Sequence, residues 1–306
     1  MRYWSLVFFI ICSLTGLKVA AQTVSDVKSP NGKLLFSFRL IKGQPVYDIS
    51  FENRKLIANS SLGLTFKDGD VYGDGLELEK PVYHTREEEY RLVTGKASVI
   101  HSTWNELMLP LRETRGAGRR IRIAVRVFND GIAFRYEFPK QDGWDRFVLT
   151  DENSTFNICG DPEIKTLLFD QYHNSHEGLY ANFRYRQAKE NVLMDLPALL
   201  QFKDCFMAIT EANLHNYAGM YLTKKGSVLT SSLSPLPGNQ AEKVKVVLPH
   251  QTPWRVLMIG QHIGDLIASN ILTDLNEAPA TNDWSWLKPG KTTFHWWNGD
   301  VLPEGY

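Results

Sequence analysis

The sequence predicts an all-β protein built as a large antiparallel β-sandwich. From Gln22 to about residue 275, apolar and polar residues alternate with a period of two, which is the pattern of half-buried strands. Turn-forming residues interrupt this alternation at short intervals, whereas helical periodicity is scarce. Some 250 residues of short strands far exceed the ~100 residues of a seven-stranded sandwich, so we expect a larger assembly.

The individual strands are predicted in chain order. After the turn at residues 29–32, residues 33–40 are apolar and β-prone. Residues 120–128 give the clearest pattern, because aliphatic side chains occupy alternate positions and arginines lie between them. Asn129-Asp130-Gly131 then predicts a hairpin turn, and residues 134–138 its return strand. Further strands are expected at 196–201, 205–210, 243–248 and 256–260, a helical turn or two at 264–270, and loops at 67–75, 112–118 and 234–238.

The composition is that of an ordinary globular protein, with 43% hydrophobic and 22% charged residues. The 34 Lys and Arg residues balance the 34 Asp and Glu residues. Since phosphate binding needs a basic face, we expect no nucleic-acid partner. Aromatic residues make up 12% of the chain, and they suit both a β core and stacking on flat ligands, so composition leaves both uses open.

Residues 1–21 have the features of a secretory signal peptide. Arg2 precedes an apolar stretch at residues 6–12, and small residues at 19–21 would suit a signal peptidase. The stretch is too short for a stable membrane span. We therefore expect an exported mature chain that begins at Gln22, is periplasmic or secreted, and has no membrane partner after cleavage. Its two cysteines, Cys159 and Cys205, are equally compatible with a disulfide and with two buried thiols.

The short motifs of several enzyme classes are absent from the sequence. It contains no G-x-S-x-G elbow, phosphate-binding glycine loop, dinucleotide fingerprint or H-E-x-x-H pair, and no zinc-like Cys or His spacing. No carboxylate pair stands out as the acid and nucleophile of a glycosidase. Such pairs are assembled in space, however, and a sequence rarely reveals them.

Residues 170–180 form the first candidate site. This segment, called here the polar loop, contains two His, two carboxylates, two amides and two Tyr within eleven residues. Loops with this density of polar groups often carry binding sites. The alternative is a solvated loop whose Tyr rings fix it to the sandwich.

Two further candidates lie nearer the C-terminus. Glu211 follows an apolar run and could face a cleft, although Asn213 and Asn216 beside it could simply satisfy backbone groups in a turn. Trp296 and Trp297 could stack on a sugar or pack between domains, and the residues alone leave these two readings equal.

Six blocks in order, read together, resemble glycoside hydrolase family 97, an exported group of α-glucosidases and α-galactosidases in Gram-negative glycan degraders. The blocks lie at residues 27–33, 127–136, 210–220, 252–256, 286–291 and 296–299. The resemblance implies that residues 22–288 form an N-terminal super-sandwich related to galactose mutarotase. Residues 289–306 would begin a catalytic (β/α)₈ barrel, with its first strand at 292–298. The catalytic carboxylates would then lie beyond Tyr306, so no catalytic residue is expected within this chain.

The resemblance also implies a role for the polar loop. Glu177 matches an acidic residue that reaches the family's active site and helps the barrel glutamates to bind calcium. Calcium takes six to eight oxygen ligands, so we expect weak or no binding by this chain without the barrel. Glu211, Trp296, Trp297 and Asn298 are the possible substrate contacts. We therefore expect this chain to be the N-terminal part of an exo-acting α-glycosidase, an enzyme that hydrolyses α-linked sugars. Its expected partner is its own missing catalytic barrel. The resemblance favours the retaining, galactosidase-like branch of the family.

Two alternatives from other functional classes stay open. One is a stand-alone carbohydrate-binding module that uses Trp and Tyr platforms. The other is a mutarotase-like sugar epimerase, which needs a His and a carboxylate facing one sugar. His173, His176 and Glu177 are the residues that suggest it.

Overall fold

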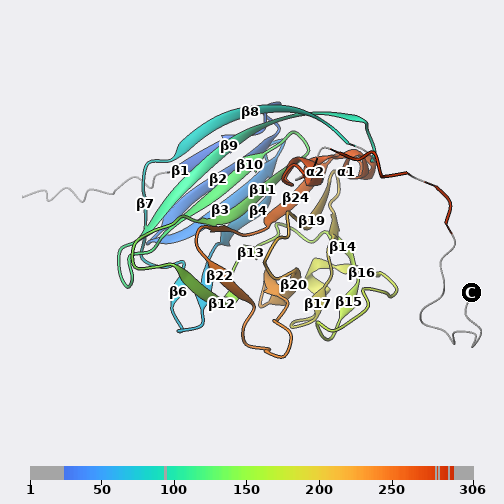
Figure 1. The fold of residues 1–306 in the computed structure, drawn as a ribbon. Helices are drawn as coiled ribbons and strands as arrows, with labels where there is room; N and C mark the ends of the chain where they lie inside the picture. The colour runs from blue at the N-terminus through green and yellow to red at the C-terminus, as the bar shows by residue number, and fades with distance from the viewer. Residues whose placement is uncertain (1–23, 93–94, 280, 282, 289, 293–306) are drawn as a thin grey trace, which may run out of the picture.

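The computed structural model describes residues 24–92, 95–279, 281, 283–288 and 290–292, and these residues form four antiparallel sheets (Figure 1). The predicted signal peptide lies outside the described residues. So do Trp296, Trp297 and Asn298, and all of the predicted barrel strand except Thr292.

Two sheets contain the first strands of the chain. The first has the order β1-β2-β3-β4, with β1 (Val24–Lys28), β2 (Leu34–Ile41), β3 (Gln44–Phe51) and β4 (Arg54–Ser61). The second has the order β22-β12-β5-β6, with β5 (Leu64–Phe66), β6 (Val71–Tyr72), β12 (Arg146–Glu152) and β22 (Val244–Val247).

The largest sheet has eleven strands, in the order β16-β14-β18-β19-β24-β11-β10-β9-β7, with β23 also pairing with β11 and β8 with β9. Its first five strands in the chain are β7 (Leu76–Leu78), β8 (Val82–Arg91), β9 (Val99–Glu113), β10 (Arg120–Val127) and β11 (Gly131–Phe138). The others are β14 (Glu163–Thr166), β16 (Ala181–Arg184), β18 (Ala198–Gln201), β19 (Phe206–Ala212), β23 (His250–Gln251) and β24 (Trp254–Gly260).

The fourth sheet and three short helices complete the described fold. The sheet has the order β13-β21-β20-β17-β15, with β13 (Thr155–Phe156), β15 (Leu168–Phe169), β17 (Leu193–Met194), β20 (Met220–Lys225) and β21 (Val228–Leu233). The helices are the 3₁₀ turn η1 (Tyr185–Gln187), α1 (Ile263–Ala268) and α2 (Ile271–Asp274). None of the helices in the described ranges is both long and apolar enough to cross a bilayer.

The side-chain alternation along the strands builds one large core between the sheets. In β10 and β11, the residues at every second position, such as Ile123 and Phe134, enter this core. A smaller core lies on the other face of the eleven-stranded sheet, where Trp254, Leu266 and Ile271 are buried together under α1 and α2. Because β24 is covered on both faces, all seven of its residues are buried, which explains why they are apolar apart from Arg255.

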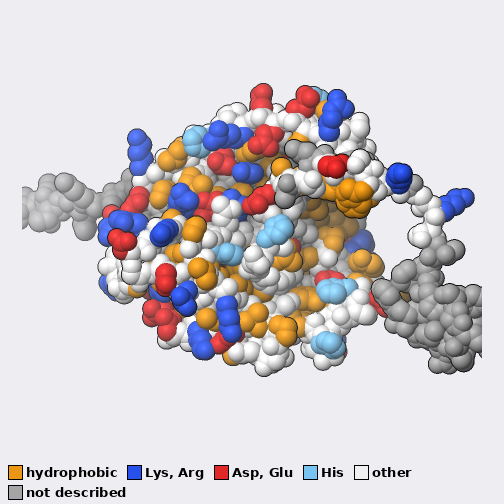
Figure 2. All heavy atoms as spheres, in the orientation of Figure 1, with side chains coloured by type: hydrophobic (Ala, Val, Ile, Leu, Met, Phe, Trp, Pro, Cys, Tyr) orange, Lys and Arg blue, Asp and Glu red, His pale blue; other side chains and the backbone are white. Residues whose placement is uncertain are grey.

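Strand β8 lies at the edge of the large sheet and pairs only with β9 among the described strands. Nine of its ten residues are exposed, and its middle carries a run of charged side chains. Figure 2 shows positive and negative side chains mixed along the upper rim of the molecule, where Figure 1 places β8. Charge of this kind on an exposed edge opposes pairing with a second molecule.

The predicted all-β class and most predicted strands are confirmed, since β2, β10, β18, β19, β22 and β24 lie within one or two residues of their predicted ranges. The return strand predicted at 134–138 is confirmed as β11, which begins three residues earlier, at Gly131. The helical turn at 264–270 is confirmed as α1.

Two predicted loops are wrong in part. Residues 67–75 include β6, because Tyr72 is buried and its hydroxyl donates to the Leu111 carbonyl oxygen at 3.2 Å. The loop at 112–118 starts later than predicted, since β9 continues to Glu113. Cys159 and Cys205 are free thiols.

Candidate functional site

The polar loop connects β15 with β16 and lies against the five-stranded sheet. His176 fixes its centre. His176 Nδ1 lies 2.9 Å from Asp195 Oδ2, and His176 Nε2 lies 3.3 Å from the Tyr221 hydroxyl. The His176 ring also stacks on the Tyr221 ring, with centroids 5.9 Å apart and an interplanar angle of 17°. These contacts hold His176 in the left-handed backbone region, at a φ of 55°.

The first half of the loop is held by further hydrogen bonds. Asn174 Nδ2 donates to the Tyr221 hydroxyl at 3.2 Å and to the Gln171 carbonyl oxygen at 3.0 Å. The Tyr172 hydroxyl lies 2.7 Å from Ser232 Oγ. Tyr172 and His176 thus fix a loop that is otherwise solvated, as the alternative reading of this segment expects, and a binding site here stays a prediction.

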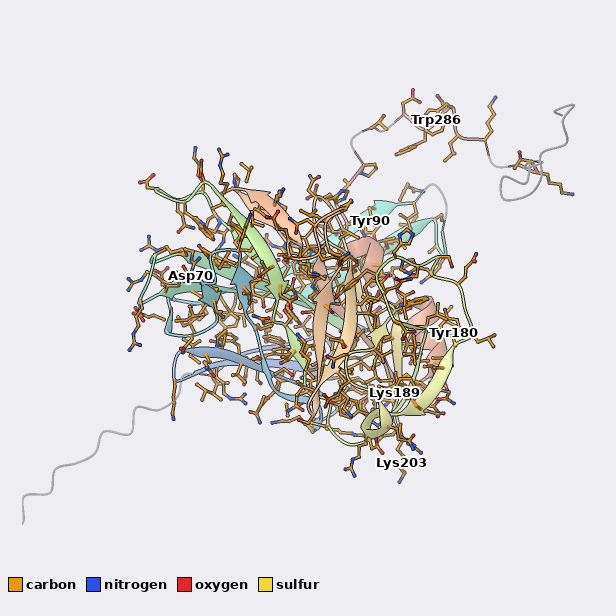
Figure 3. All side chains as sticks on the ribbon, turned by 90° about the horizontal axis from the view of Figure 1, so that it is seen from below. Asp70, Tyr90, Tyr180, Lys189, Lys203 and Trp286 are labelled. Carbon is orange, nitrogen blue, oxygen red and sulfur yellow. The ribbon has the colours of Figure 1, made fainter. Side chains whose placement is uncertain are left out.

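Glu177 follows these fixed residues directly, and its side chain is exposed. Its carboxylate makes no hydrogen bond or ion pair with any described residue, so both oxygens are free for a ligand. Leu179 and Tyr180 beside it are 97% and 70% exposed. Figure 3 shows Tyr180 at the outer edge of the molecule. Large apolar side chains that extend this far into solvent are typical of a surface that another body covers.

Glu177 fits a calcium ion as one ligand only. Over the described ranges, no group of three or more His, Cys, Asp or Glu side chains could hold a metal ion. Calcium takes six to eight oxygens, and a carboxylate supplies one or two of them. The carboxylate is thus suited to complete a site whose other ligands come from elsewhere.

The structure places Glu211 differently, in a buried ion cluster. Glu211 Oε2 accepts a hydrogen bond from Arg255 at 2.6 Å, and Glu211 Oε1 accepts one from the Met220 amide at 3.2 Å. Arg255 also donates two hydrogen bonds to Glu152, at 2.8 and 2.6 Å. The Tyr217 hydroxyl donates to the same Glu152 carboxylate at 3.1 Å. The Glu211 oxygens are therefore engaged within the fold, and a substrate contact by this residue stays a prediction.

Burial sets the electrostatics of this cluster. Arg255 and Glu152 have fully buried side chains. Burial alone would lower the pKa of Arg255, but the attraction and hydrogen bonds of Glu152 raise it above the ordinary value. Burial raises the pKa of Glu211, against the opposing effect of Arg255. The cluster holds three charges with a net charge of −1 when Glu211 is ionised.

The sequence reasoning missed Glu152 and Arg255. A signal for Arg255 was present, because it is the one charged residue in the apolar run Trp254–Gly260. A charge inside such a run needs a buried partner. Glu152 ends β12, 103 positions away, and only the folded chain brings the two together.

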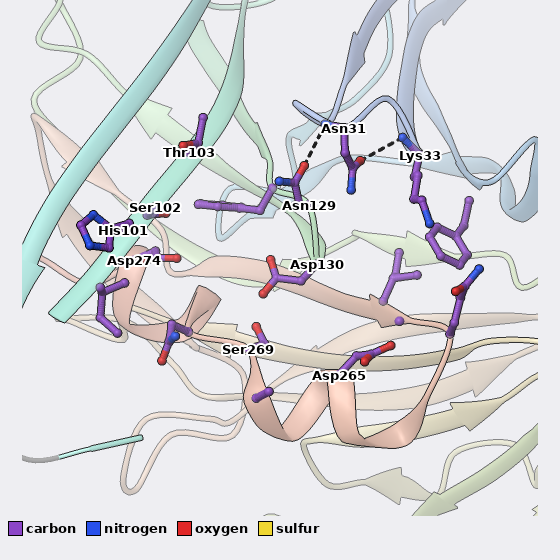
Figure 4. Close-up of a pocket in the computed structure, with 18 residues that line it drawn as sticks. Asn31, Lys33, His101, Ser102, Thr103, Asn129, Asp130, Asp265, Ser269 and Asp274 are labelled. Atoms are coloured by element: carbon purple, nitrogen blue, oxygen red, sulfur yellow. Dashed lines mark hydrogen bonds between the residues drawn. The ribbon is translucent and has the colours of Figure 1, made fainter. Parts of the chain in front are cut away.

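His173, His176 and Glu177 do not form the constellation of a sugar epimerase. The carboxylate that contacts His176 is that of Asp195, and Glu177 contacts neither histidine. An open groove of about 480 Å³ lies elsewhere, between α1, α2 and the ends of β9 and β10 (Figure 4). Asp130, Asp265 and Asp274 line it, as Figure 4 shows. Neither Glu177 nor Glu211 lines this groove.

Comparison with known proteins identifies the fold and the family. Over 96% of its length, the chain is 27% identical to a retaining α-galactosidase of Bacteroides thetaiotaomicron, and over 84% it is 27% identical to a probable retaining α-galactosidase of Streptomyces bingchenggensis. The structure superposes with a TM-score of 0.80 and 27% identity on a glycoside hydrolase family 97 enzyme from Pseudoalteromonas sp. strain K8 in complex with acarbose, covering 87% of this chain.

The chain spans only part of each of these proteins. It covers 47% and 38% of the two α-galactosidases and 40% of the Pseudoalteromonas enzyme. The model of the glycosyl-hydrolase 97 N-terminal domain matches residues 27–278, which is most of the chain. The chain therefore belongs to glycoside hydrolase family 97, and this match identifies the β-super-sandwich as the family's N-terminal domain.

Proposed function

We propose that this chain is the N-terminal part of an exported, exo-acting α-glycosidase that removes terminal α-linked sugars, with α-galactosides as first choice and α-glucosides as second. Its relatives in the same family are named as retaining α-galactosidases, which supports this choice of substrate. In a retaining glycosidase one carboxylate attacks the sugar while a second protonates the leaving oxygen. Both would come from a catalytic barrel, the proposed partner of this domain.

The observation that carries the proposal is the state of Glu177. A fixed loop holds this carboxylate at the surface, both its oxygens lack partners among the described residues, and Leu179 and Tyr180 extend beside it. In the proposed enzyme Glu177 binds a calcium ion together with carboxylates of the barrel. The ion would polarise the substrate near the bond that is cut. Ligands drawn from two domains would also fix the orientation of those domains.

The test uses the complete gene product that contains this chain. It is expected to release nitrophenol from 4-nitrophenyl α-D-galactopyranoside with calcium present, and to lose most of this activity with EDTA. Glu177→Gln should weaken calcium binding at least tenfold without unfolding the protein. Glu87→Gln, an exposed residue on β8, is the matched control and should leave both properties unchanged. A complete gene product that hydrolyses neither aryl α-galactosides nor aryl α-glucosides would sink the proposal.

Export is a separate part of the proposal and has a simpler test. Residues 1–21 would direct the chain out of the cytoplasm. N-terminal sequencing of the protein from its native cells should begin at Gln22. A mature protein that retains Met1 would contradict export by this route.

A further inference from the structure

Asp195 anchors the polar loop, although no sequence pattern singled it out. It lies between β17 and β18, and its Oδ2 atom is 2.9 Å from His176 Nδ1. The Asp195 side chain is 14% exposed, whereas that of His176 is 57% exposed. Asp195 is therefore the inner member of this pair, and His176 connects it to the surface of the loop.

The main chain of Asp195 is fixed on both sides. Its amide donates to the Leu167 carbonyl oxygen at 3.0 Å, and its carbonyl oxygen accepts a hydrogen bond from Thr166 Oγ1 at 2.8 Å. Thr166 is the last residue of β14 and is fully buried. Asp195 is thus attached to the end of a strand of the eleven-stranded sheet, and through His176 it ties the polar loop to that sheet.

The hydrogen bonds of the His176 ring have a consistent direction of donation. A carboxylate only accepts, so His176 Nδ1 donates to Asp195, and Nε2 of an uncharged ring then accepts. The donor to Nε2 is the Tyr221 hydroxyl, at 3.3 Å. Burial raises the pKa of Tyr221, so this hydroxyl keeps its proton at neutral pH. The same hydroxyl oxygen accepts a hydrogen bond from Asn174 Nδ2 at 3.2 Å.

Asn174 closes these hydrogen bonds into a ring. Its Oδ1 accepts the backbone amide of His176 at 3.0 Å, while its Nδ2 donates to Tyr221. Each donor in the ring meets an acceptor, so the ring favours one arrangement of the His176 main chain and side chain together. That arrangement includes a φ of 55°, which a residue other than glycine keeps only where its surroundings hold it.

Glu177 takes its position from this ring. No described residue holds the Glu177 carboxylate, so its reach is limited by its main chain, which follows His176 directly. A calcium ligand places its oxygen about 2.3–2.6 Å from the ion. Binding sites need their ligands held within about 0.5 Å of the correct geometry. An anchor for the residue next to the ligand therefore affects how well the ligand can bind.

Asp195 is poorly suited to be a ligand itself. Its Oδ2 atom is engaged by His176, and its side chain is largely buried. In the part of the chain that the structure describes, no group of three or more His, Cys, Asp or Glu side chains could hold a metal ion. Residues that orient a metal ligand from behind commonly change metal affinity about 10–100-fold.

We propose that Asp195 is a positioning residue for Glu177, because its hydrogen bond to His176 holds the polar loop in the form in which Glu177 can join a calcium site. This inference rests on the proposed function for the identity of the ion and for the barrel that supplies its other ligands. The role requires the hydrogen bond and not the charge of Asp195. Asparagine, which also accepts a hydrogen bond, should therefore replace aspartate here.

The test is a calorimetric titration of the complete gene product with calcium chloride. Asp195→Ala should weaken calcium binding about tenfold, whereas Asp195→Asn should stay within about threefold of the wild type. His176→Phe keeps a ring on Tyr221 but removes both nitrogens, and it should weaken binding as much as Asp195→Ala does. Adding Asp195→Ala to His176→Phe should have no further effect, because Asp195 acts through the His176 ring.

Asp161→Ala is the matched control. Asp161 also lies in a loop, and its Oδ1 accepts a hydrogen bond from the Arg186 backbone amide at 2.9 Å. This variant should bind calcium as the wild type does. Hydrogen exchange of the calcium-free gene product adds a measurement that needs no metal. Asp195→Ala should speed amide exchange across residues 174–178, and Asp161→Ala should leave it unchanged there.

Three results would overturn the inference. The first is calcium binding in Asp195→Ala that is as tight as in the wild type. The second is an equal loss in Asp195→Asn, which would make the charge or direct ligation the cause. The third is a further loss when Asp195→Ala is added to His176→Phe. A wild-type gene product that binds no calcium would overturn the proposed function and this inference with it, whereas the first three results leave the proposed function standing.

Discussion

Glu177 and Glu211 both stood out in the sequence, and the structure gives their carboxylates opposite surroundings. Glu177 is exposed, and both its oxygens are free of described residues, although the residues just before it are fixed by stacking and hydrogen bonds. Glu211 is largely buried, and both its oxygens accept hydrogen bonds from its own fold. A carboxylate is available to a ligand when the protein fixes its backbone but leaves its oxygens unused. Glu177 meets this condition and Glu211 does not.

The strongest test of this contrast is to remove a charge from the buried cluster. Arg255→Met should lower the free energy of unfolding by about 3–5 kcal/mol, because Glu152 would be left buried without a counter-ion. Urea denaturation measures this loss. Glu152→Leu combined with Arg255→Met should recover part of it, since the fully buried charge of Glu152 would be gone and only the partly exposed Glu211 would lack its counter-ion. A loss below about 1 kcal/mol in the single variant would mean that the cluster is not a structural unit.

The next effect concerns the residue that holds the polar loop. Tyr221→Phe removes the hydroxyl that contacts both Asn174 and His176, but keeps the ring on which His176 stacks. We expect a loss of about 1 kcal/mol in stability and faster amide exchange across residues 170–177. Tyr83→Phe, at an exposed position of β8, is the control. Unchanged exchange in Tyr221→Phe would show that the loop is fixed by stacking alone.

Glu211→Gln should have a smaller effect that depends on pH. Glutamine can still accept the hydrogen bond of the Met220 amide, and Arg255 keeps both bonds to Glu152, so we expect a change of about 1 kcal/mol or less at neutral pH. Because burial raises the folded-state pKa of Glu211, its contribution is fully present below the unfolded value near 4.5 and is lost as pH rises through the folded value. Urea denaturation at pH 4 and pH 7 should therefore show that the stability of the variant, relative to that of the wild type, is higher at pH 7 than at pH 4. A higher relative stability at pH 4 would mean that the pKa of Glu211 is lowered in the folded state.

The smallest effect on stability is expected at Glu177. Glu177→Gln should change the free energy of unfolding by less than ~0.5 kcal/mol, since the side chain contacts no described residue. The same denaturation series measures it. A loss comparable to that of Arg255→Met would show that Glu177 supports the fold, and its role as a ligand would then be doubtful.

The fold was largely predictable from local patterns, and the site was predictable only in part. The alternation in β10 and β11 and the Asn129-Asp130-Gly131 turn depend on neighbours in the chain, so they can be read from the sequence. The exposed edge strand β8 escaped prediction because charged residues dominate it and no apolar face marks it. The ion cluster joins residues 44 and 103 positions apart, and no local pattern encodes such a contact.

A contact between β8 and α2 fixes the position from which the chain continues after residue 275. The Tyr90 hydroxyl of β8 donates to Asp274 at 2.6 Å, and Ile271 and Leu275 are buried in the smaller core, so α2 is attached to the large sheet by a hydrogen bond and by apolar packing. Any segment that continues from Leu275 starts from a defined position and not from a freely moving end. A restricted starting point reduces the volume that a following body explores, and so raises its effective concentration at the domain surface.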